Sequence, residues 1–431
     1  MVLFWHRRDL RIHDNAGLYK ALKRGDKVKP IFIFDKEILD DLPKDDQRVL
    51  FIHQEITKLK KAYQDLGSDL TIYYGDPIEV FKRIIEKEIP QTTHVFTNRD
   101  YEPYALNRDK AIFEYLKSRK IEFIGAKDHV IFEKEEITKD DGKPYKVFTP
   151  YMRRWKEKVN DFYLKSYPTK KYTNNLSSFN KTSAMITLAD MGFSNEQKMD
   201  FPSVNIDEKI IKDYEKTRDI PALKGTTRMS LHLRFGTVSI RELARIGGKN
   251  EKYLNELIWR DFYQMIIYYF PEIVNKALKP KYDDIPWEND EKKFKKWSEG
   301  KTGYPIVDAG MRELNKTGFM HNRVRMIVAS FLTKHLLIDW RWGEAYFAKK
   351  LLDFELASNA GGWQWAASSG VDAQPYFRVF NPYTQQEKFD KDEKYIKKWI
   401  PEYKTSDYPE PIVEHKFARE RAINTFKETL K

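Results

Sequence analysis

Four short segments in the second half of the sequence combine residue types that could do chemistry. They are GTTRMS at 225–230, ELIWR at 256–260, NRVRM at 322–326 and DFELASNAGGWQW at 353–365. Hydroxyl, guanidinium and carboxylate groups bind charged or polar ligands, and indole rings pack against flat ones. These segments therefore hold the candidate site residues, although each also has a purely structural alternative.

The segment at 225–230 places three hydroxyls and one arginine directly before a helical run. Backbone amides at the start of a helix, together with such hydroxyls, form a cradle for an anion such as a phosphate. The alternative is helix capping, because serine and threonine are common cap residues. Taken alone, the segment favours capping.

The segment at 256–260 puts Glu256, Trp259 and Arg260 on one helical face, because their spacing is three and four residues. A Glu256–Arg260 ion pair beside a half-buried tryptophan explains this pattern equally well, and composition alone favours it. In the segment at 322–326, Asn322, Arg325 and Met326 share a face, while Arg323 points elsewhere.

The segment at 353–365 is the most distinctive, because it joins two acids, an asparagine, a glycine pair and two tryptophans. Glycines let the backbone approach a flat or crowded neighbour closely. Core packing is the usual role of a single tryptophan. The combination is harder to explain by structure alone and favours a functional site.

The first 125 residues are predicted to form a Rossmann-like α/β domain. Apolar, β-branched runs alternate with segments of helical periodicity, as in a parallel sheet with helices on both faces. The expected strands are Val2 to Trp5, Val28 to Phe34, Leu70 to Tyr74, His94 to Thr97 and Glu122 to Ile124. The expected helices are Ala16 to Lys23, Gln47 to Leu66, Pro77 to Glu88 and Tyr104 to Lys120.

Two local signals refine this domain. Asp76 can cap the third helix, and Pro77 fits its first turn, where the missing amide costs nothing. No G-x-G-x-x-G follows the first strand and no Walker loop is present, so the domain is not expected to bind NAD in the usual way.

The rest of the chain is predicted to be a linker followed by a helical domain. Residues 126–202 carry polar clusters with few periodic runs, apart from a short helix at FTPYMRRWKEKV. From residue 203 to 431 apolar repeats of three and four residues indicate an all-α domain. Its clearest helices are Tyr253 to Phe270, Pro305 to Lys316, Asn322 to Ile338 and Trp342 to Leu351.

Composition sets outer limits on the function. The 431 residues suit two or three domains, and 41% hydrophobic residues supply a packed core. The absence of cysteine excludes disulfides, thiol nucleophiles and cysteine-ligated metals. The net charge of +12 fits either a polyanionic partner or ordinary solubility. No apolar run is long enough for a membrane span, so a cytoplasmic protein is expected.

Five blocks of the sequence resemble the photolyase and cryptochrome flavoprotein family. They occur in the family's order and span nearly the whole chain. The blocks are FWHRRDLRIHDN (4–15), ELIWRDFY (256–263), EGKTGYPIVDAGMREL (299–314), MHNRVRM (320–326) and GGWQWAASSGVDAQPYFRVFNP (361–382). Asn322 and Met326 resemble the class I branch that repairs cyclobutane pyrimidine dimers, whereas the histidine-centred pattern of (6-4) repair is missing.

The resemblance implies a noncovalent FAD inside the helical domain, with no metal, and replaces the capping interpretation of residues 225–230. Arg325 and Asp353 would pair beside the flavin ring, and Asn359 would face its redox-active nitrogen. The remaining implied FAD-binding residues are Tyr214, Thr226, Thr227, Met229, Ser230, Tyr253, Arg260, Asn322 and Glu355.

The resemblance also implies residues for the damaged DNA. Glu256, assisted by Asn322, would hydrogen-bond the pyrimidine edge, while Trp259 and Trp365 would stack on the extruded dimer beside Met326. The expected phosphate-binding residues are Arg218, Arg323 and Arg378. An electron-transfer chain from the flavin to the surface is implied for Trp363, Trp340 and Trp287.

Three positions depart from the family pattern. Ala360 replaces a second asparagine of many relatives, and Glu355 stands where some have aspartate, so the tuning of the flavin is open. Ala105 replaces the glutamate of folate-binding relatives. A folate antenna is therefore not expected, whereas a deazaflavin, a second flavin or no antenna all stay open.

Two other functions remain as alternatives to DNA repair by a monomeric enzyme. A cryptochrome, a light-sensing signalling protein on the same scaffold, is the first. The joint presence of Glu256, Trp259, Asn322 and Met326 favours repair over it. The second alternative, an unrelated nucleotide-binding α/β enzyme, would need catalytic motifs that the sequence lacks.

Overall fold

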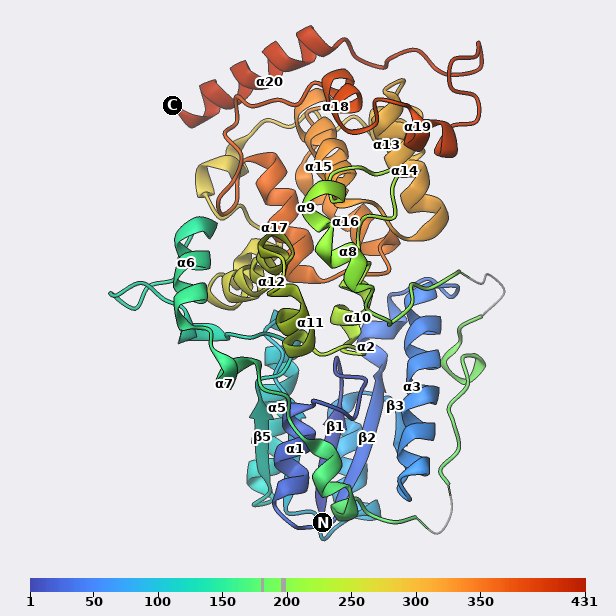
Figure 1. Cartoon of the computed structure of the whole chain (residues 1–431), viewed down its shortest axis with the longest axis vertical. Coiled ribbons are helices and arrows are strands. Elements are labelled where there is room, and N and C mark those ends of the chain that lie inside the picture. Colours follow the sequence, from blue (N-terminus) through green and yellow to red (C-terminus); the bar gives the residue numbers. More distant parts are fainter. Residues whose placement is uncertain (180–181, 195–198) are drawn as a thin grey trace. The chain divides into compact units, whose positions relative to one another are not determined.

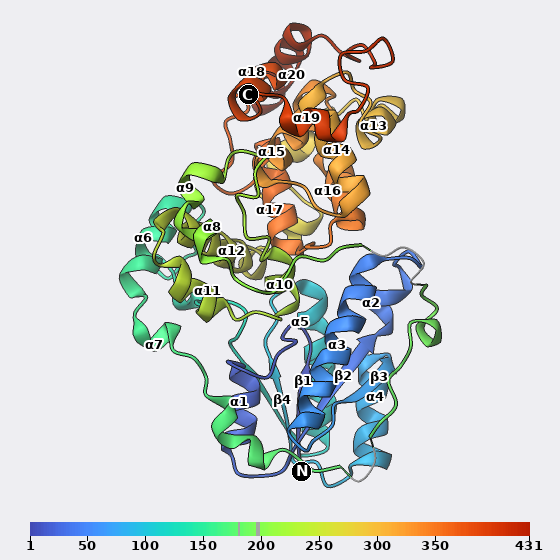
Figure 2. The same ribbon diagram turned by 45° about the vertical axis from the view of Figure 1, so that its right-hand side comes forward.

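The chain folds into two compact units, shown in the computed structural model of Figures 1 and 2. The structure describes residues 1–179, 182–194 and 199–431. The first unit comprises Met1–Glu133, Glu157–Ile206 and Arg228–Ile246. The second comprises Lys134–Lys156, Asp207–Thr227 and Gly247–Lys431. The boundaries expected at residues 125 and 202 stay predictions.

A five-stranded parallel sheet forms the centre of the first unit, in the order β3-β2-β1-β4-β5 (Figure 1). Its strands are β1 (Val2–His6), β2 (Val28–Asp35), β3 (Thr71–Gly75), β4 (His94–Asn98) and β5 (Glu122–Ala126). All five predicted strands are confirmed to within two residues at each end. The inner strands β1, β2 and β4 are nearly all buried because helices cover both faces, as expected of a doubly wound sheet, whereas the edge strands β3 and β5 are only partly buried.

Alternation along β1 divides its side chains between these two faces. Leu3 and Trp5 join the core cluster that contains Phe81 of α4 and Ile112 of α5. On the opposite face, the ring of His6 bonds to the hydroxyl of Tyr63 in α3 at 2.7 Å. The helices of this unit are α1 (Ala16–Lys23), α2 (Lys36–Asp40), α3 (Gln47–Asp65), α4 (Pro77–Arg83), α5 (Pro103–Ser118), α7 (Asp161–Leu164), α10 (Ser230–Phe235) and α11 (Ile240–Gly247).

The predicted start of α4 is confirmed. Asp76 accepts hydrogen bonds from the amides of Ile78 and Glu79, and Pro77 lies in the first turn. The predicted single helix to Glu88 is only partly right, because a π-helical segment replaces the α-helix over Ile84–Glu88.

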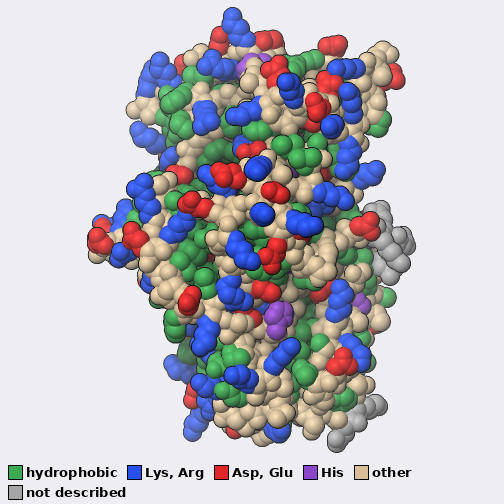
Figure 3. All heavy atoms as spheres, viewed as in Figure 1, with side chains coloured by type: hydrophobic (Ala, Val, Ile, Leu, Met, Phe, Trp, Pro, Cys, Tyr) green, Lys and Arg blue, Asp and Glu red, His purple; other side chains and the backbone are tan. Residues whose placement is uncertain are grey.

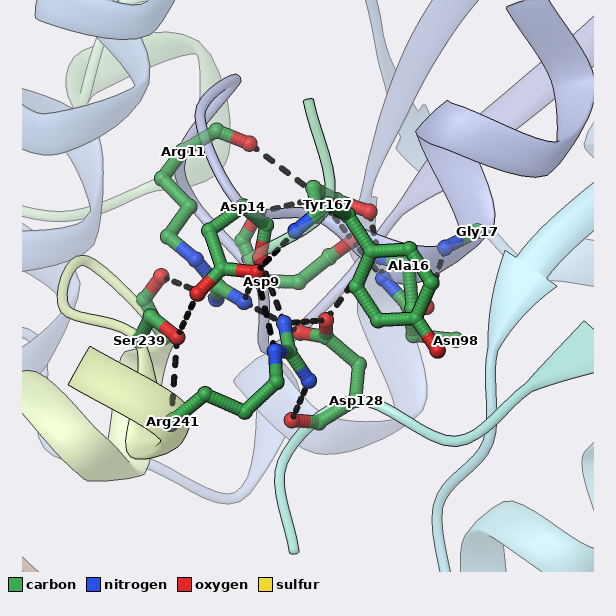
Figure 4. A network of polar contacts seen from close by, with 12 residues as sticks. Asp9, Arg11, Asp14, Ala16, Gly17, Asn98, Asp128, Tyr167, Ser239 and Arg241 are labelled. Atoms are coloured by element: carbon green, nitrogen blue, oxygen red, sulfur yellow. Dashed lines mark hydrogen bonds and ion pairs between the residues drawn. The ribbon is translucent and has the colours of Figure 1, made fainter. Parts of the chain in front are cut away.

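A buried network of charges attaches the segment 228–246 to the loops that follow β1 and β5 in the first unit (Figure 4). Arg241 of α11 bonds to Asp14 at 2.9 Å and to Asp128 at 2.8 Å. Arg11 bonds to the other oxygen of Asp128 at 2.7 Å. Burial alone would raise the pKa of Asp128, but the two arginines hold it below its ordinary value. Because removing one member would strand a buried charge, the network fixes this segment firmly.

The second unit is helical, as the sequence predicts for most of its length. Helix α15 is followed directly by a π-helix, η7 (Phe331–His335), so the expected continuous helix from 322 to 338 is wrong. The helices are α6 (Phe148–Lys158), α8 (Glu208–Lys212), α9 (Tyr214–Thr217), α12 (Glu251–Tyr269), α13 (Glu291–Ser298), α14 (Pro305–Thr317), α15 (Asn322–Ser330), α16 (Trp340–Lys350), α17 (Leu356–Ala367), α18 (Pro382–Phe389), α19 (Lys394–Trp399) and α20 (His415–Leu430).

Four of these helices position the expected site. Helix α17 packs against both α12 and α15, and α9 packs against α12. None of the helices in the described part of the chain has both the length and the apolar character that a membrane span requires.

Candidate flavin and DNA site

Helix α12 carries four of the predicted residues: Tyr253, Glu256, Trp259 and Arg260. Asn250 starts the helix, since its side chain accepts hydrogen bonds from the amides of Lys252 and Tyr253. Tyr253 and Arg260 are buried, whereas Glu256 and Trp259 are half-buried. Helix α12 thus carries two site residues in the protein interior and two that are partly exposed to solvent.

The alternative of a Glu256–Arg260 ion pair within α12 is wrong. Glu256 bonds to Arg218 at the end of α9, and Arg260 bonds to Glu355 at 2.8 Å. Arg260 and Glu355 are both less than a tenth exposed. The two residues therefore tie α12 to different neighbours, which spacing along one helix cannot reveal.

Helix α15 starts at Asn322, which is exposed, and its N-cap is His321. Arg325 holds both oxygens of Asp353, at 3.1 and 3.0 Å, which confirms the predicted pair. Arg323 instead bonds to Asp219, at 3.1 and 2.8 Å. The two arginines thus point to separate acids, as the spacing predicts.

Helix α17 brings Asn359, Trp363 and Trp365 into the site. The amide nitrogen of Asn359 donates to the backbone oxygen and a carboxylate oxygen of Glu344, at 3.1 and 2.8 Å. At Gly361 a Cβ would lie 2.3 Å from the ring of Tyr263, so this glycine permits close packing on α12. At Gly362 a Cβ would meet open space.

The segment expected to bind phosphates is divided between the two units. Thr226 and Thr227 belong to the second unit, where the hydroxyl of Thr227 lies 3.1 Å from that of Tyr253. Met229 and Ser230 belong to the first unit, at the start of α10. The N-cap of α10 is Met229 and makes no side-chain cap bond, so the structure does not bear out the capping alternative.

The residues expected to contact the lesion lie on α12, α15 and α17. Trp259 stacks on Phe148, with the ring centroids 3.7 Å apart. Met326 and Trp365 are both half-buried and pack against the same core cluster. Arg378 is exposed. On the face shown in Figure 3, basic and acidic side chains are interspersed.

The tryptophans expected to transfer electrons differ in exposure. Trp363 and Trp340 are almost completely buried, whereas Trp287 is half-buried and packs edge-on against Phe426 of α20. Trp363 also packs edge-on against Trp297, with the two ring centroids 6.1 Å apart. Their role as a chain stays a prediction.

Burial shifts three ionisable groups of the site. It raises the pKa of Glu256 above its ordinary value, although Arg218 acts in the opposite direction. It also raises the pKa of Glu344, against which the Asn359 hydrogen bond acts. Burial lowers the pKa of His321 to about 4. The ring of His321 is therefore neutral, so that its Nδ1 can accept the amide hydrogen of Arg323.

The donor set fits a bound FAD. Arg325 offers a guanidinium for the polar edge of a flavin, and the carboxamide of Asn359 is held by Glu344. Tyr214, Thr226 and Thr227 add hydroxyls. The open space at Gly362, within an otherwise buried stretch of α17, lets a flat group approach the helix backbone.

Comparison with known proteins decides the family. Residues 253–406 match the family described as the FAD binding domain of DNA photolyase, and residues 2–171 match DNA photolyase. A deoxyribodipyrimidine photo-lyase of Halobacterium salinarum is 36% identical, with 99% of each chain covered. That of Escherichia coli is also 36% identical, over 99% of this chain and 98% of its own. The chain belongs to the DNA photolyase family.

Solved photolyases have the same fold. A class III photolyase from Agrobacterium tumefaciens has a TM-score of 0.87 and 32% identity, covering 100% of this chain and 97% of its own. An archaeal photolyase from Sulfolobus tokodaii, described with two FAD molecules, has a TM-score of 0.85 and 34% identity, covering 99% of both chains. FAD is thereby confirmed as the cofactor of this flavoprotein family member. The photolyase class to which the protein belongs and the identity of any antenna chromophore stay predictions.

Four residues make contacts at the site that were not predicted from the sequence: Phe148, Asp219, His321 and Glu344. Asp219 directly follows a predicted DNA-binding arginine, and His321 directly precedes Asn322. Their positions were thus a usable signal. Phe148 and Glu344 had none, because they lie on helices whose packing the sequence does not specify.

Proposed function

We propose that the protein repairs cyclobutane pyrimidine dimers in DNA under light. Bound reduced FAD supplies the photoexcited electron that splits the dimer, as expected of a cofactor that carries the difficult chemistry. The partner is UV-damaged DNA, and the protein acts as a monomer in the cytoplasm. Photolyases are themselves enzymes that extrude their target bases from the duplex.

The observation that carries this proposal is the arrangement of α12. Within one turn it bears Arg260, bonded to Glu355 of the expected flavin pocket, and Glu256 and Trp259 for the lesion. A single rigid helix thereby supports both reacting partners, which fixes their separation.

Different residues of the protein bind the flavin and the lesion. Arg325 and Asp353 orient the flavin, with Tyr214, Thr226, Thr227, Met229 and Ser230 binding its phosphates and ribityl chain. Glu256 hydrogen-bonds the pyrimidine edge, assisted by Asn322, and so lies beside the developing negative charge. Trp259, Trp365 and Met326 exclude water around the dimer.

The test is a repair assay on an oligonucleotide with one thymine dimer. Protein loaded with FAD and chemically reduced should restore the thymines under blue light and leave them unchanged in darkness. An oligonucleotide with a (6-4) lesion is the control for lesion type and should stay unrepaired. Dimer that persists under light would contradict the proposal.

A cryptochrome is the second candidate, because a Synechocystis cryptochrome has a TM-score of 0.85 with this chain at 26% identity, covering 99% of both chains. The same assay separates the two functions. Binding of the dimer without light-dependent restoration of the bases would favour the photoreceptor.

A further inference from the structure

Asp219 links the two arginines that are expected to bind DNA phosphates. Its carboxylate accepts hydrogen bonds from Nε and Nη2 of Arg323, at 3.1 and 2.8 Å. The same carboxylate oxygen lies 4.0 Å from Nε of Arg218. Arg218 in turn bonds to Glu256. Four charged residues thus form one row, Glu256, Arg218, Asp219 and Arg323, of which Arg218 and Asp219 directly follow α9 while the other two lie on α12 and α15.

Arg323 and Asp219 differ in how firmly they are held. The guanidinium of Arg323 lies over the ring of Phe389, 4.4 Å from its centroid, and its Nη1 lies 3.6 Å from the sulfur of Met326. The side chain of Asp219 is 43% exposed, against 19% for Arg323. Arg323 is therefore already oriented, and Asp219 is the partner that solvent or a phosphate can replace.

The charges of these four residues cancel in two pairs. With Arg218 bonded to Glu256 and Arg323 bonded to Asp219, neither guanidinium presents an uncompensated charge to a DNA backbone. Engagement of Glu256 by a pyrimidine edge would change this balance. Arg218 would then lose its carboxylate, and the nearest remaining one is that of Asp219.

We propose that Asp219 is a specificity-determining residue that couples dimer recognition to backbone binding. When Glu256 turns to the dimer, Asp219 shifts towards Arg218 and releases Arg323 for a phosphate. On undamaged DNA, Glu256 stays on Arg218 and Asp219 keeps Arg323 occupied. This inference rests on the proposed function, because it requires Glu256 to bind the lesion.

The experiment compares Asp219→Asn with Glu215→Gln, a matched control. Glu215 is an exposed acid on α9, four residues before Asp219, and its partner is Lys252 at 3.9 Å. Binding of undamaged and dimer-containing duplexes is measured over a range of salt concentrations. Thermal unfolding of each variant checks that the fold is intact.

D219N frees Arg323 in every state, so affinity for undamaged DNA should rise about fivefold, the size expected of one exposed ion pair. The log-log salt slope on undamaged DNA should steepen by about 0.9, for one additional phosphate. Affinity for the dimer should change less than twofold, so the preference for damage falls. E215Q should raise both affinities by the same small factor.

A second variant tests the coupling itself. Glu256→Gln cannot hold Arg218 as an ion pair, so undamaged DNA should bind more tightly here too. In an Arg323→Gln background the E256Q change should give no increase, because the coupling makes Arg323 the arginine that is released. An increase that persists in E256Q/R323Q would show that Arg218 itself is released, which would contradict the coupling.

The outcomes separate this inference from the proposed function. Wild-type protein without any preference for dimer-containing DNA would overturn the proposed function itself. Wild type that prefers dimers, with the preference unchanged in D219N or with D219N and E215Q indistinguishable, would overturn only the role of Asp219.

Discussion

Phe148 and Trp259 lie face to face, with their ring centroids 3.7 Å apart and their planes inclined by 6°. Phe148 begins α6 and Trp259 lies on α12, more than a hundred residues later. Tyr263 lies 5.4 Å from the indole, tilted by 33°. Because Phe148 occupies one face of the indole, it fixes the plane that the other face offers to a base.

The first prediction concerns this stack. Phe148→Leu keeps an apolar side chain but removes the ring, so the indole loses its fixed plane. Binding of dimer-containing DNA should weaken about fivefold, the range expected of one aromatic pair, while undamaged DNA binds as before. Phe162→Leu is the control, because Phe162 is exposed and packs on Tyr163. Equal dimer binding by F148L and wild type would show that the stack does not orient Trp259.

The second prediction concerns the retention of FAD. Asp353→Asn leaves Arg325 without its carboxylate, and loss of one partner of a largely buried pair is costly. We expect FAD affinity to fall at least tenfold, measured by flavin content after purification and by titration of the apoprotein. Asp392→Asn removes an equal charge from an exposed pair with Lys394 and should retain FAD fully. Full flavin content in D353N would refute a role for this pair.

The third prediction concerns electron transfer. Trp363→Phe should slow light-driven reduction of bound oxidised FAD at least tenfold, because phenylalanine does not oxidise readily. Repair by enzyme reduced beforehand should stay largely intact. Trp297→Phe is the matched control, because Trp297 is a buried neighbour 6.1 Å from Trp363 but lies outside the expected chain. If both variants slow reduction equally, a general disturbance of the core is the cause.

The fourth prediction concerns pH and stability. Lys334 is fully buried, with its Nζ 3.0 Å from the hydroxyl of Ser368 and over the ring of Phe426. Burial lowers its pKa well below the ordinary lysine value. Unfolding therefore takes up a proton between the lowered and the ordinary pKa. Because of this group, the free energy of unfolding increases as pH rises through that window and decreases as pH falls through it.

Lys334→Met should remove this dependence. Compared with wild type, the variant should be more stable at pH 7 and gain less stability between pH 7 and 9.5. The difference in slope should approach about 1.4 kcal/mol per pH unit, the value for one proton. Urea unfolding at several pH values measures it, with the exposed Lys427→Met as control. Parallel pH profiles for K334M and wild type would mean that Lys334 is charged in the folded protein.

Local pattern was enough to predict most of the elements. Apolar, β-branched runs placed the five strands, and the cap formed by Asp76 and Pro77 placed the start of α4. The order of motifs along the chain indicated the family and its FAD cofactor. These signals succeed because burial and capping act on residues that are near one another in the chain.

The π-helical segments were not predictable in this way. In Phe331–His335 the apolar periodicity continues, yet the hydrogen-bond pattern changes. The segment carries Lys334 and His335, whose side chains reach Ser368 and His415. Tertiary packing determines such a local change of hydrogen-bond pattern, so the apolar pattern of the sequence alone does not predict it.

The sequence by itself determined most of the secondary structure, the α/β and helical halves and the residue types available to a flavin and a damaged base. Only the tertiary structure decided which partners Glu256, Arg260 and Asp219 meet. Glu256 pairs with Arg218 rather than with Arg260 on its own helix, and Asp219 reaches Arg323 across 104 positions of the chain. An ion pair depends on which helices pack together, and that arrangement results from the whole core rather than from any short stretch of residues.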